Sequence, residues 1–180
     1  MNYETKTLNS KRLVIKKGDK KDFLSVYEYD FKKLKNIDGV FLYVKKDLKE
    51  FDNLFKGGKD KYYNRLKKAH MFDWIIYLKD EPIGNILTNY EDEKEVEIKC
   101  NMHPLYWNKG YMKEALKEVI KYLFEIGYEK ILFGYEDGNK KAKCLSETLG
   151  FKPYKILKDE YTTEKNNKVD IYMTVKEKKS

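Results

Sequence analysis

The chain has 180 residues and a mass of 21.7 kDa, which is enough for one domain with its own hydrophobic core. Charged residues make up 38% of it and the formal net charge is +8, yet Arg12 and Arg65 are the only arginines. Because arginine is the usual bidentate reader of bases and phosphates, this composition argues against sequence-specific nucleic-acid recognition. It remains compatible with a polyanionic small molecule, an acidic partner or weak, non-specific RNA contact.

The cysteines and histidines indicate neither a disulfide framework nor a metal site. Cys100 and Cys144 are the only cysteines, and His70 and His103 lie far from any pattern of zinc ligands. The first residues lack an apolar signal core, and no apolar run approaches the ~18 residues of a membrane span. We therefore expect a cytoplasmic protein with reduced thiols, no metal and no membrane contact.

The N-terminal third predicts one short strand and two helical regions. The strand is Leu13-Val14-Ile15, and Asp19 can cap a helix that begins at Lys20. The buried face of that helix would consist of Phe23, Leu24, Val26 and Tyr27. A second helical region is expected from about Lys46 to His70, with a break at Gly57-Gly58. The pattern between Lys32 and Val44 favours no single structure.

From Asp73 the spacing of apolar residues changes to two, which predicts strands. We expect three antiparallel strands, at Trp74–Leu78, Ile83–Tyr90 and Val96–Met102. A turn over Lys79–Pro82 and an acidic turn over Glu91–Glu95 would join them.

The stretch Tyr106–Gly127 then combines a glycine-containing loop with an amphipathic helix. Its apolar residues recur at the three- and four-residue spacing of a single helix face: Met112, Leu116, Val119, Ile120 and Leu123. A strand, a short glycine loop and a helix N-terminus together point several unpaired backbone N–H groups at one place, which suits a phosphate. Asn108 and Gly110 allow close backbone approach, and Lys109 and Lys113 add positive charge. We interpret this stretch as a pyrophosphate cradle, although many such turns hold no nucleotide.

The rest of the chain continues the α/β pattern. Lys130–Tyr135 predicts a strand that returns beside Val96–Met102 through a right-handed crossover. A short helix should follow over Asn139–Leu149, and a final hairpin should pair Tyr154–Tyr161 with Val169–Val175.

These motifs, in this order, resemble the GNAT superfamily of acetyl-CoA-dependent N-acetyltransferases. In that family a strand containing Glu-Ile leads to a Pro-x-Tyr-Trp-Gly-Lys-Gly-Tyr-Ala loop and a Glu-Ala-Leu helix. The corresponding residues here are Glu97-Ile98, Pro104–Met112 and Glu114-Ala115-Leu116. The later family signature is present as Asn139, Ala142 and Leu149-Gly150-Phe151.

The resemblance covers essentially the whole chain, 1–180, as a single domain. It implies an α/β fold with a mixed, mostly antiparallel central sheet flanked by helices, and a splay between parallel strands around Cys100 and Leu132. Acetyl-CoA would enter the splay, and the amine would approach from the opposite side. The implied CoA contacts fall on Asn101, Met102, Asn108, Lys109, Gly110, Tyr111, Met112, Lys113 and Asn139. The segments Asn9–Leu13 and Asp170–Tyr172 are similar to the branch with ribosomal-protein N-terminal acetyltransferases.

Two candidate catalytic residues follow from the same resemblance. Glu97 matches a carboxylate that some relatives use through a water, and an amine with a pKa around ~10 needs such a base at pH 7. The alternative is that Glu97 is an ordinary solvent-facing strand residue. Ser146 stands where many members have a tyrosine proposed to protonate the leaving thiolate. A thiol pKa near ~8.5 lets the thiolate leave without a strong acid.

Two other departures from the family pattern concern the cradle, since Asn108 and Met112 replace small residues. The long Met112 side chain at the helix start is expected to crowd the pyrophosphate. Asn139 can either contact the pantetheine or cap its own helix.

The leading prediction is therefore an N-acetyltransferase that uses acetyl-CoA and a primary amine, on a peptide N-terminus, a polyamine or another small molecule. A monomer or a homodimer is compatible with the sequence. Two alternatives are a catalytically weak GNAT-like module that binds CoA and a lysine-rich RNA- or ribosome-associated protein without acyl chemistry.

Overall fold

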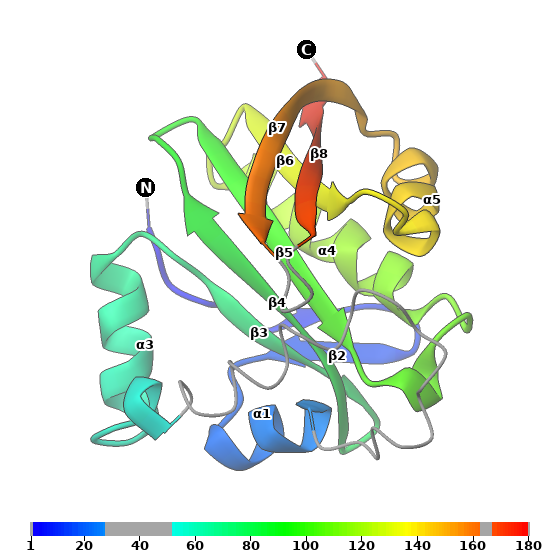
Figure 1. Cartoon of the computed structure of the whole chain (residues 1–180). Helices are drawn as coiled ribbons and strands as arrows, with labels where there is room; N and C mark the ends of the chain where they lie inside the picture. The colour runs from blue at the N-terminus through cyan, green and yellow to red at the C-terminus, as the bar shows by residue number, and fades with distance from the viewer. Residues whose placement is uncertain (1, 28–51, 163–166, 180) are drawn as a thin grey trace.

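The computed structural model describes residues 2–27, 52–162 and 167–179 (Figure 1). Its elements are β1 Leu8–Asn9, β2 Leu13–Lys16, α1 Lys20–Tyr27, α3 Lys59–Lys68, β3 Asp73–Leu78, β4 Glu81–Tyr90, β5 Glu95–Met102, a 3₁₀ turn Pro104–Tyr106, α4 Tyr111–Glu125, β6 Lys130–Glu136, α5 Lys140–Thr148, β7 Lys152–Thr162 and β8 Lys168–Glu177. Within these ranges the strands form one sheet with the order β1-β2-β3-β4-β5-β6-β8-β7. Only β5 and β6 pair in parallel; the other neighbouring strands are antiparallel. The predicted α/β fold with a mostly antiparallel sheet is confirmed.

The predicted start of the first helix is confirmed in atomic detail. The Asp19 carboxylate accepts a hydrogen bond from the Asp22 backbone N–H at 3.1 Å, and Asp22 accepts one from the Asp19 N–H at 2.8 Å. This reciprocal pair satisfies two N–H groups at the start of α1. Leu24 is half-buried, whereas the other three residues predicted for the inner face are buried.

The predicted break in the second helical region is also confirmed. Gly57 and Gly58 both have φ of 91°, a left-handed conformation that few other residues adopt, and α3 begins directly after them. The ambiguous stretch 32–44 and the start of the predicted region at 46–51 lie outside the described residues.

The predicted turn over Lys79–Pro82 was too long. Glu81 already pairs with Leu78, so the hairpin closes through two residues, and Lys79 takes the positive φ of 58° that such a tight turn requires. Pro82 lies opposite Tyr77, beside a register shift in β3 that accommodates a residue without an N–H.

Helices cover both faces of the sheet, with α1 and α3 on one side and α4 and α5 on the other (Figure 1). The larger core lies under α4 and contains Trp74, Leu116, Val119, Tyr128 and Phe133 among its buried residues. A second core lies under α1 and α3 and is rich in aromatics, with Phe23, Phe55, Tyr62, Tyr63 and Tyr77. Burying each such side chain contributes ~1.5–3 kcal/mol, so both layers are held by apolar packing.

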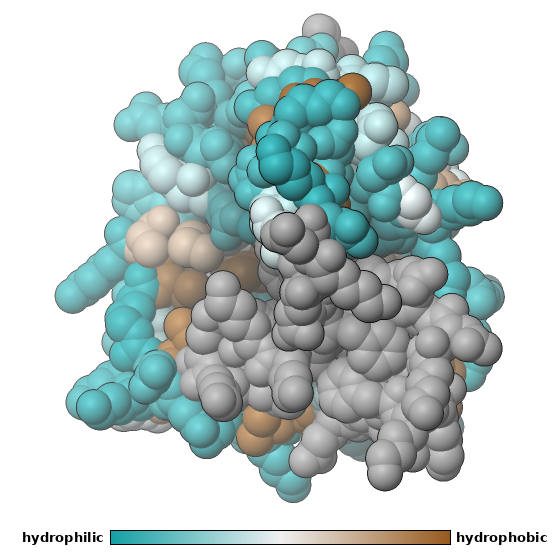
Figure 2. All heavy atoms as spheres, viewed as in Figure 1, coloured by the Kyte–Doolittle hydropathy of each residue, from teal (hydrophilic) through white to brown (hydrophobic). Residues whose placement is uncertain are grey.

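The C-terminal hairpin is present as predicted, but its second strand lies inside the sheet. β8 pairs with β6 on one side and β7 on the other, which leaves β7 at the edge. Most β7 residues are exposed, including Tyr154 and Ile156 at 48% each. The described surface in Figure 2 is mostly hydrophilic, in keeping with the high charge content. None of the described helices has the length and apolar content needed to span a membrane.

Candidate functional site

The two parallel strands separate halfway along their length. Their pairing runs from Glu95–Lys130 to Ile98–Phe133 and goes no further. Beyond that point β5 continues beside β4 to Met102, while β6 continues beside β8 to Glu136. The expected splay therefore opens directly after Ile98. Among the described residues, the β5 edge that faces it, from Lys99 to Met102, has no strand partner on the β6 side.

The loop after β5 leaves the start of α4 open. Asn108 and Gly110 have φ of 60° and 78°, and Gly110 is the N-cap of α4 without a side-chain hydrogen bond. The first-turn N–H groups of a helix have no intrahelical acceptors, and here the N-cap residue is a glycine with no side chain to accept from one of them. All three residues from 108 to 110 are exposed, so these groups can reach an anion.

Trp107 anchors this loop to both sides of the splay. Its indole N–H donates to the Met102 carbonyl at the end of β5, at 2.6 Å. From the β6 side, the Lys141 ammonium in the first turn of α5 lies 4.1 Å from the centroid of the Trp107 ring. The loop after β5 and the helix after β6 therefore meet at the mouth of the splay.

The predicted cofactor residues at the start of α4 take different positions. Met112 is half-buried and packs against the larger core, so its length is accommodated by the core. Tyr111 is half-buried as well, with the Arg12 guanidinium 4.5 Å from its ring centroid. The Lys109 ammonium lies 5.4 Å from the Tyr106 ring, and Lys113 is half-buried.

The side chains of Asn101 and Asn139 differ in their hydrogen bonding. The Asn139 amide oxygen accepts a hydrogen bond from the Ala142 N–H at 3.0 Å, which makes Asn139 the N-cap of α5. Asn101 is on β5 beside the splay, and its amide nitrogen is buried without a hydrogen-bond partner among the described residues. The backbone of Asn101 and Met102 belongs to the unpaired edge of β5.

Glu97 lies just before the splay, on the sheet face that α1 and α3 cover. Its side chain is 15% exposed. The Asn89 amide donates to Oε2 at 2.8 Å, and the Lys99 ammonium is 3.7 Å from the same oxygen. The carboxylate is thus held in place without being fully enclosed, which suits a group that exchanges a proton with water.

Ser146 is fully buried at the inner face of α5. Its hydroxyl is 2.9 Å from the Thr174 hydroxyl, which itself donates to the Phe133 carbonyl at 2.8 Å. Because Thr174 has a single proton and gives it to Phe133, Ser146 must donate to Thr174. This arrangement favours a structural role, since the Ser146 proton is already engaged between helix and sheet.

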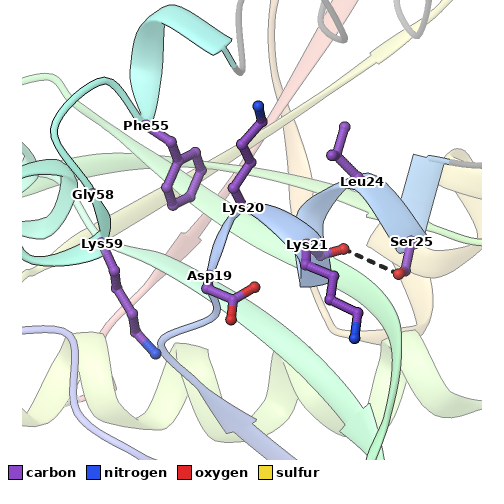
Figure 3. A pocket seen from close by; sticks show the side chains of 8 residues that line it. All are labelled: Asp19, Lys20, Lys21, Leu24, Ser25, Phe55, Gly58 and Lys59. Carbon is purple, nitrogen blue, oxygen red and sulfur yellow. Dashed lines mark hydrogen bonds between the residues drawn. The ribbon is translucent and has the colours of Figure 1, made fainter.

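A hollow of about 680 Å³ lies away from this site, over α1 and the turn before α3 (Figure 3). Its lining residues are Asp19, Lys20, Lys21, Leu24, Ser25, Phe55, Gly58 and Lys59. None of the residues predicted to act in catalysis or cofactor binding lines it. Among the described residues, moreover, no three His, Cys, Asp or Glu side chains gather closely enough to hold a metal ion.

The sequence did not predict one set of contacts at the site, which Arg12 makes. The Arg12 guanidinium donates to the Lys109 carbonyl and to the Glu114 carboxylate, across 97 and 102 residues of sequence. No periodicity or motif relates positions so far apart. The family resemblance included Arg12 only as part of an N-terminal segment, without a role.

Known proteins match both the sequence and the fold. The family described as "Acetyltransferase (GNAT) domain" matches residues 12–152. The uncharacterized N-acetyltransferase YnaD of Bacillus subtilis (strain 168) is 31% identical over 150 residues, which cover 81% of this chain and 82% of YnaD. The crystal structure of a GNAT-family acetyltransferase from Bacillus anthracis has a TM-score of 0.70 and 26% identity, covering 96% of this chain and 98% of that one.

A third match shows the fold alone, since its identity is only 12%. It is RimL, a ribosomal L7/L12 alpha-N-protein acetyltransferase solved with coenzyme A, with a TM-score of 0.78 over 96% of this chain and 98% of RimL. The sheet with one splayed parallel pair and helices on both faces defines a mixed α/β protein. With the family match over residues 12–152, the chain belongs to the GNAT acetyltransferase family.

Proposed function

We propose that this protein is an N-acetyltransferase that moves the acetyl group of acetyl-CoA to a primary amine. The observation that carries the proposal is the splay after Ile98 together with the uncapped start of α4. A helix N-terminus with open N–H groups binds a pyrophosphate, and an unpaired strand edge offers hydrogen bonds to an extended pantetheine. In this proposal the N–H groups from Asn108 to Lys113 hold the pyrophosphate, and Asn101 and Met102 hold the pantetheine through their backbone.

Glu97 is the proposed general base. Its two described contacts are both to Oε2, so we assign proton acceptance to Oε1 through an ordered water. Glu97 takes one proton from the ammonium through this water, and the neutral nitrogen then attacks the thioester carbonyl. The C–S bond breaks as the amide forms, the CoA thiolate leaves, and the second proton of the nitrogen passes through solvent to the thiolate. Because the Ser146 proton is engaged by Thr174, we propose that the thiolate leaves without an acid from Ser146.

The acceptor is proposed to be a protonated amine that arrives on the Glu97 side of the sheet. Burial, followed by the negative charges of Glu97 and Glu95, raises the pKa of Glu91. Lys155 and Lys99 oppose this shift in part. The carboxylates of Glu91, Glu95 and Glu97 still favour the approach of a cationic amine. A peptide or protein N-terminus is the first acceptor to test, because RimL is named as an alpha-N-protein acetyltransferase.

A turnover screen tests the proposal directly. Purified protein would be given acetyl-CoA with N-terminal peptides, polyamines or aminoglycosides, and thiol release would be followed together with the acetylated product. Acetylation of at least one amine class is the expected result. Calorimetric CoA binding without turnover on any amine would instead select the CoA-binding module, and the buried, engaged Ser146 hydroxyl is the observation that keeps that candidate open.

A further inference from the structure

The Arg12 side chain connects the N-terminal strands to the open start of α4. Its Nε donates to Glu114 Oε2 at 2.7 Å, and its Nη1 and Nη2 each donate to the Lys109 carbonyl at 3.3 Å. The guanidinium also stacks over the Tyr111 ring at 4.5 Å. One planar cation therefore contacts the loop, the first helical residue and the first-turn carboxylate together.

Glu114 is the reason why these contacts matter for an anionic ligand. It lies in the first turn of α4, where a carboxylate is attracted by the same helix dipole and N–H groups that would hold a pyrophosphate. Its Oε1 instead accepts hydrogen bonds from the Ser10 hydroxyl at 2.7 Å and from the Arg12 backbone N–H at 2.8 Å. Partial burial acts to raise the pKa of Glu114, but the bonds from Ser10 and Arg12 outweigh it and lower the pKa. Glu114 is thus an anion whose charge Arg12 balances.

The guanidinium also packs beside Gly110, the N-cap of α4. A Cβ placed on Gly110 would lie 3.5 Å from Arg12 Nη2. With two N–H groups on the Lys109 carbonyl, Arg12 holds that carbonyl in place at the residue before the helix cap. The orientation of this carbonyl helps to decide which way the following N–H groups point.

We infer that Arg12 is a positioning residue of the cofactor site: it holds Glu114 and the Lys109 carbonyl so that the open N–H groups of α4 receive the CoA pyrophosphate without a competing carboxylate. This inference rests on the proposed use of CoA. It assigns Arg12 an action through Glu114 and the loop, and no direct bond to the ligand.

The test measures binding of two ligands by calorimetry, CoA and pantetheine, because only CoA carries the pyrophosphate. Arg12→Gln leaves Glu114 unbalanced and should weaken CoA binding about tenfold while pantetheine binding stays unchanged. In the double variant Arg12→Gln/Glu114→Gln the competing charge is gone, and CoA affinity should return to within about threefold of wild type. Arg12→Lys keeps the charge but loses the planar fork that reaches Glu114 and the Lys109 carbonyl together, so it should recover only part of the lost affinity.

Arg65→Gln is the matched control, since the second arginine donates to the carbonyls of Leu54 and Lys56 beside α3. It should leave CoA affinity unchanged. Two results would overturn the inference: wild-type CoA affinity in Arg12→Gln, or an equal loss in the single and double variants, which would mean that the Glu114 carboxylate does not compete for the N–H groups. If the wild-type protein binds no CoA, the proposed function itself fails, and that outcome is distinct from both.

Discussion

The two parallel strands are each followed by a helix on the same face of the sheet, yet the two helix starts differ. α4 begins at Gly110 without a capping side chain, whereas the Asn139 amide closes the start of α5 by binding the Ala142 N–H. On the inner face of α5 the Ser146 hydroxyl is likewise hydrogen-bonded, to the Thr174 hydroxyl. Polar groups left open after β5 are available to a ligand, and those satisfied after β6 stabilise the fold. This contrast supports the proposed placement of CoA at the β5–α4 half.

The strongest test of the contrast places the same charge at both helix starts. Gly110→Asp puts a carboxylate among the open N–H groups of α4, where it should repel the pyrophosphate and lower CoA affinity by ~10²-fold or more. Gly138→Asp is the control, because Gly138 precedes α5 with a similar φ of 80° and has open space around its Cβ position. Calorimetry should find CoA affinity lost only in the first variant. The contrast breaks if Gly110→Asp binds CoA like wild type.

Kinetics of Glu97 variants can distinguish a role in proton transfer from a role in binding the acceptor. Glu97→Gln keeps the shape and removes the base, so kcat should fall ~10²-fold and recover in part at higher pH, where more of the amine arrives neutral. Glu95→Gln, two residues earlier on the same face, should change kcat little. Steady-state kinetics with the acceptor found in the screen would measure both. An increase in KM alone would make Glu97 an electrostatic contact for the acceptor.

Asp73 lies on the same face of the sheet as Glu97, but its carboxylate is buried and Glu97 is partly exposed. Asp73 is 3% exposed and accepts a hydrogen bond from the Tyr62 hydroxyl at 2.5 Å. Burial, offset only in part by hydrogen bonds from Tyr62 and Asn85, raises the pKa of Asp73 to about 8. In the unfolded chain the pKa of an aspartate is about 3.9. Between about pH 3.9 and pH 8 the folded protein therefore binds a proton at Asp73 that the unfolded chain has lost. The free energy of unfolding falls as the pH rises through this range.

Asp73→Asn should therefore stabilise the protein, and its advantage over wild type in thermal melts should grow from pH 5 to pH 8, by up to ~1.4 kcal/mol per pH unit. Asp80→Asn removes a carboxylate from the exposed hairpin turn and should give no such trend. A pH-independent difference between wild type and Asp73→Asn would mean that Asp73 stays ionised throughout.

The smallest expected effect belongs to the closed start of α5. Asn139→Ala removes the cap and should lower the free energy of unfolding by ~1 kcal/mol, while CoA affinity stays the same. Asn139→Ser keeps a capping oxygen and should recover most of that stability. Denaturant titration and calorimetry would follow the two quantities. A drop in CoA affinity for both variants would show instead that the Asn139 amide also contacts the pantetheine.

Much of the site could be predicted because its signals are local. The alternation in Val96–Met102 and the helical spacing after Gly110 report which face of each element is apolar, and both elements formed as predicted. The cap at Asp19 and the break at Gly57-Gly58 are local as well, since a capping oxygen and a positive φ involve only neighbouring residues. The right-handed crossover rule predicted the parallel pair, and the family motifs added its splay.

What the sequence determined by itself is therefore the strand–loop–helix unit, its open N-terminus and the place of Glu97 before the splay. Only the tertiary structure decided which polar groups remain available. The insertion of β8 between β6 and β7 brings Thr174 to Ser146 and engages its hydroxyl. The packing of α3 encloses Asp73, and the first strands bring Arg12 to Glu114 across 102 residues. These contacts depend on how distant segments pack, and hydrophobic periodicity reports only which face of a segment is buried.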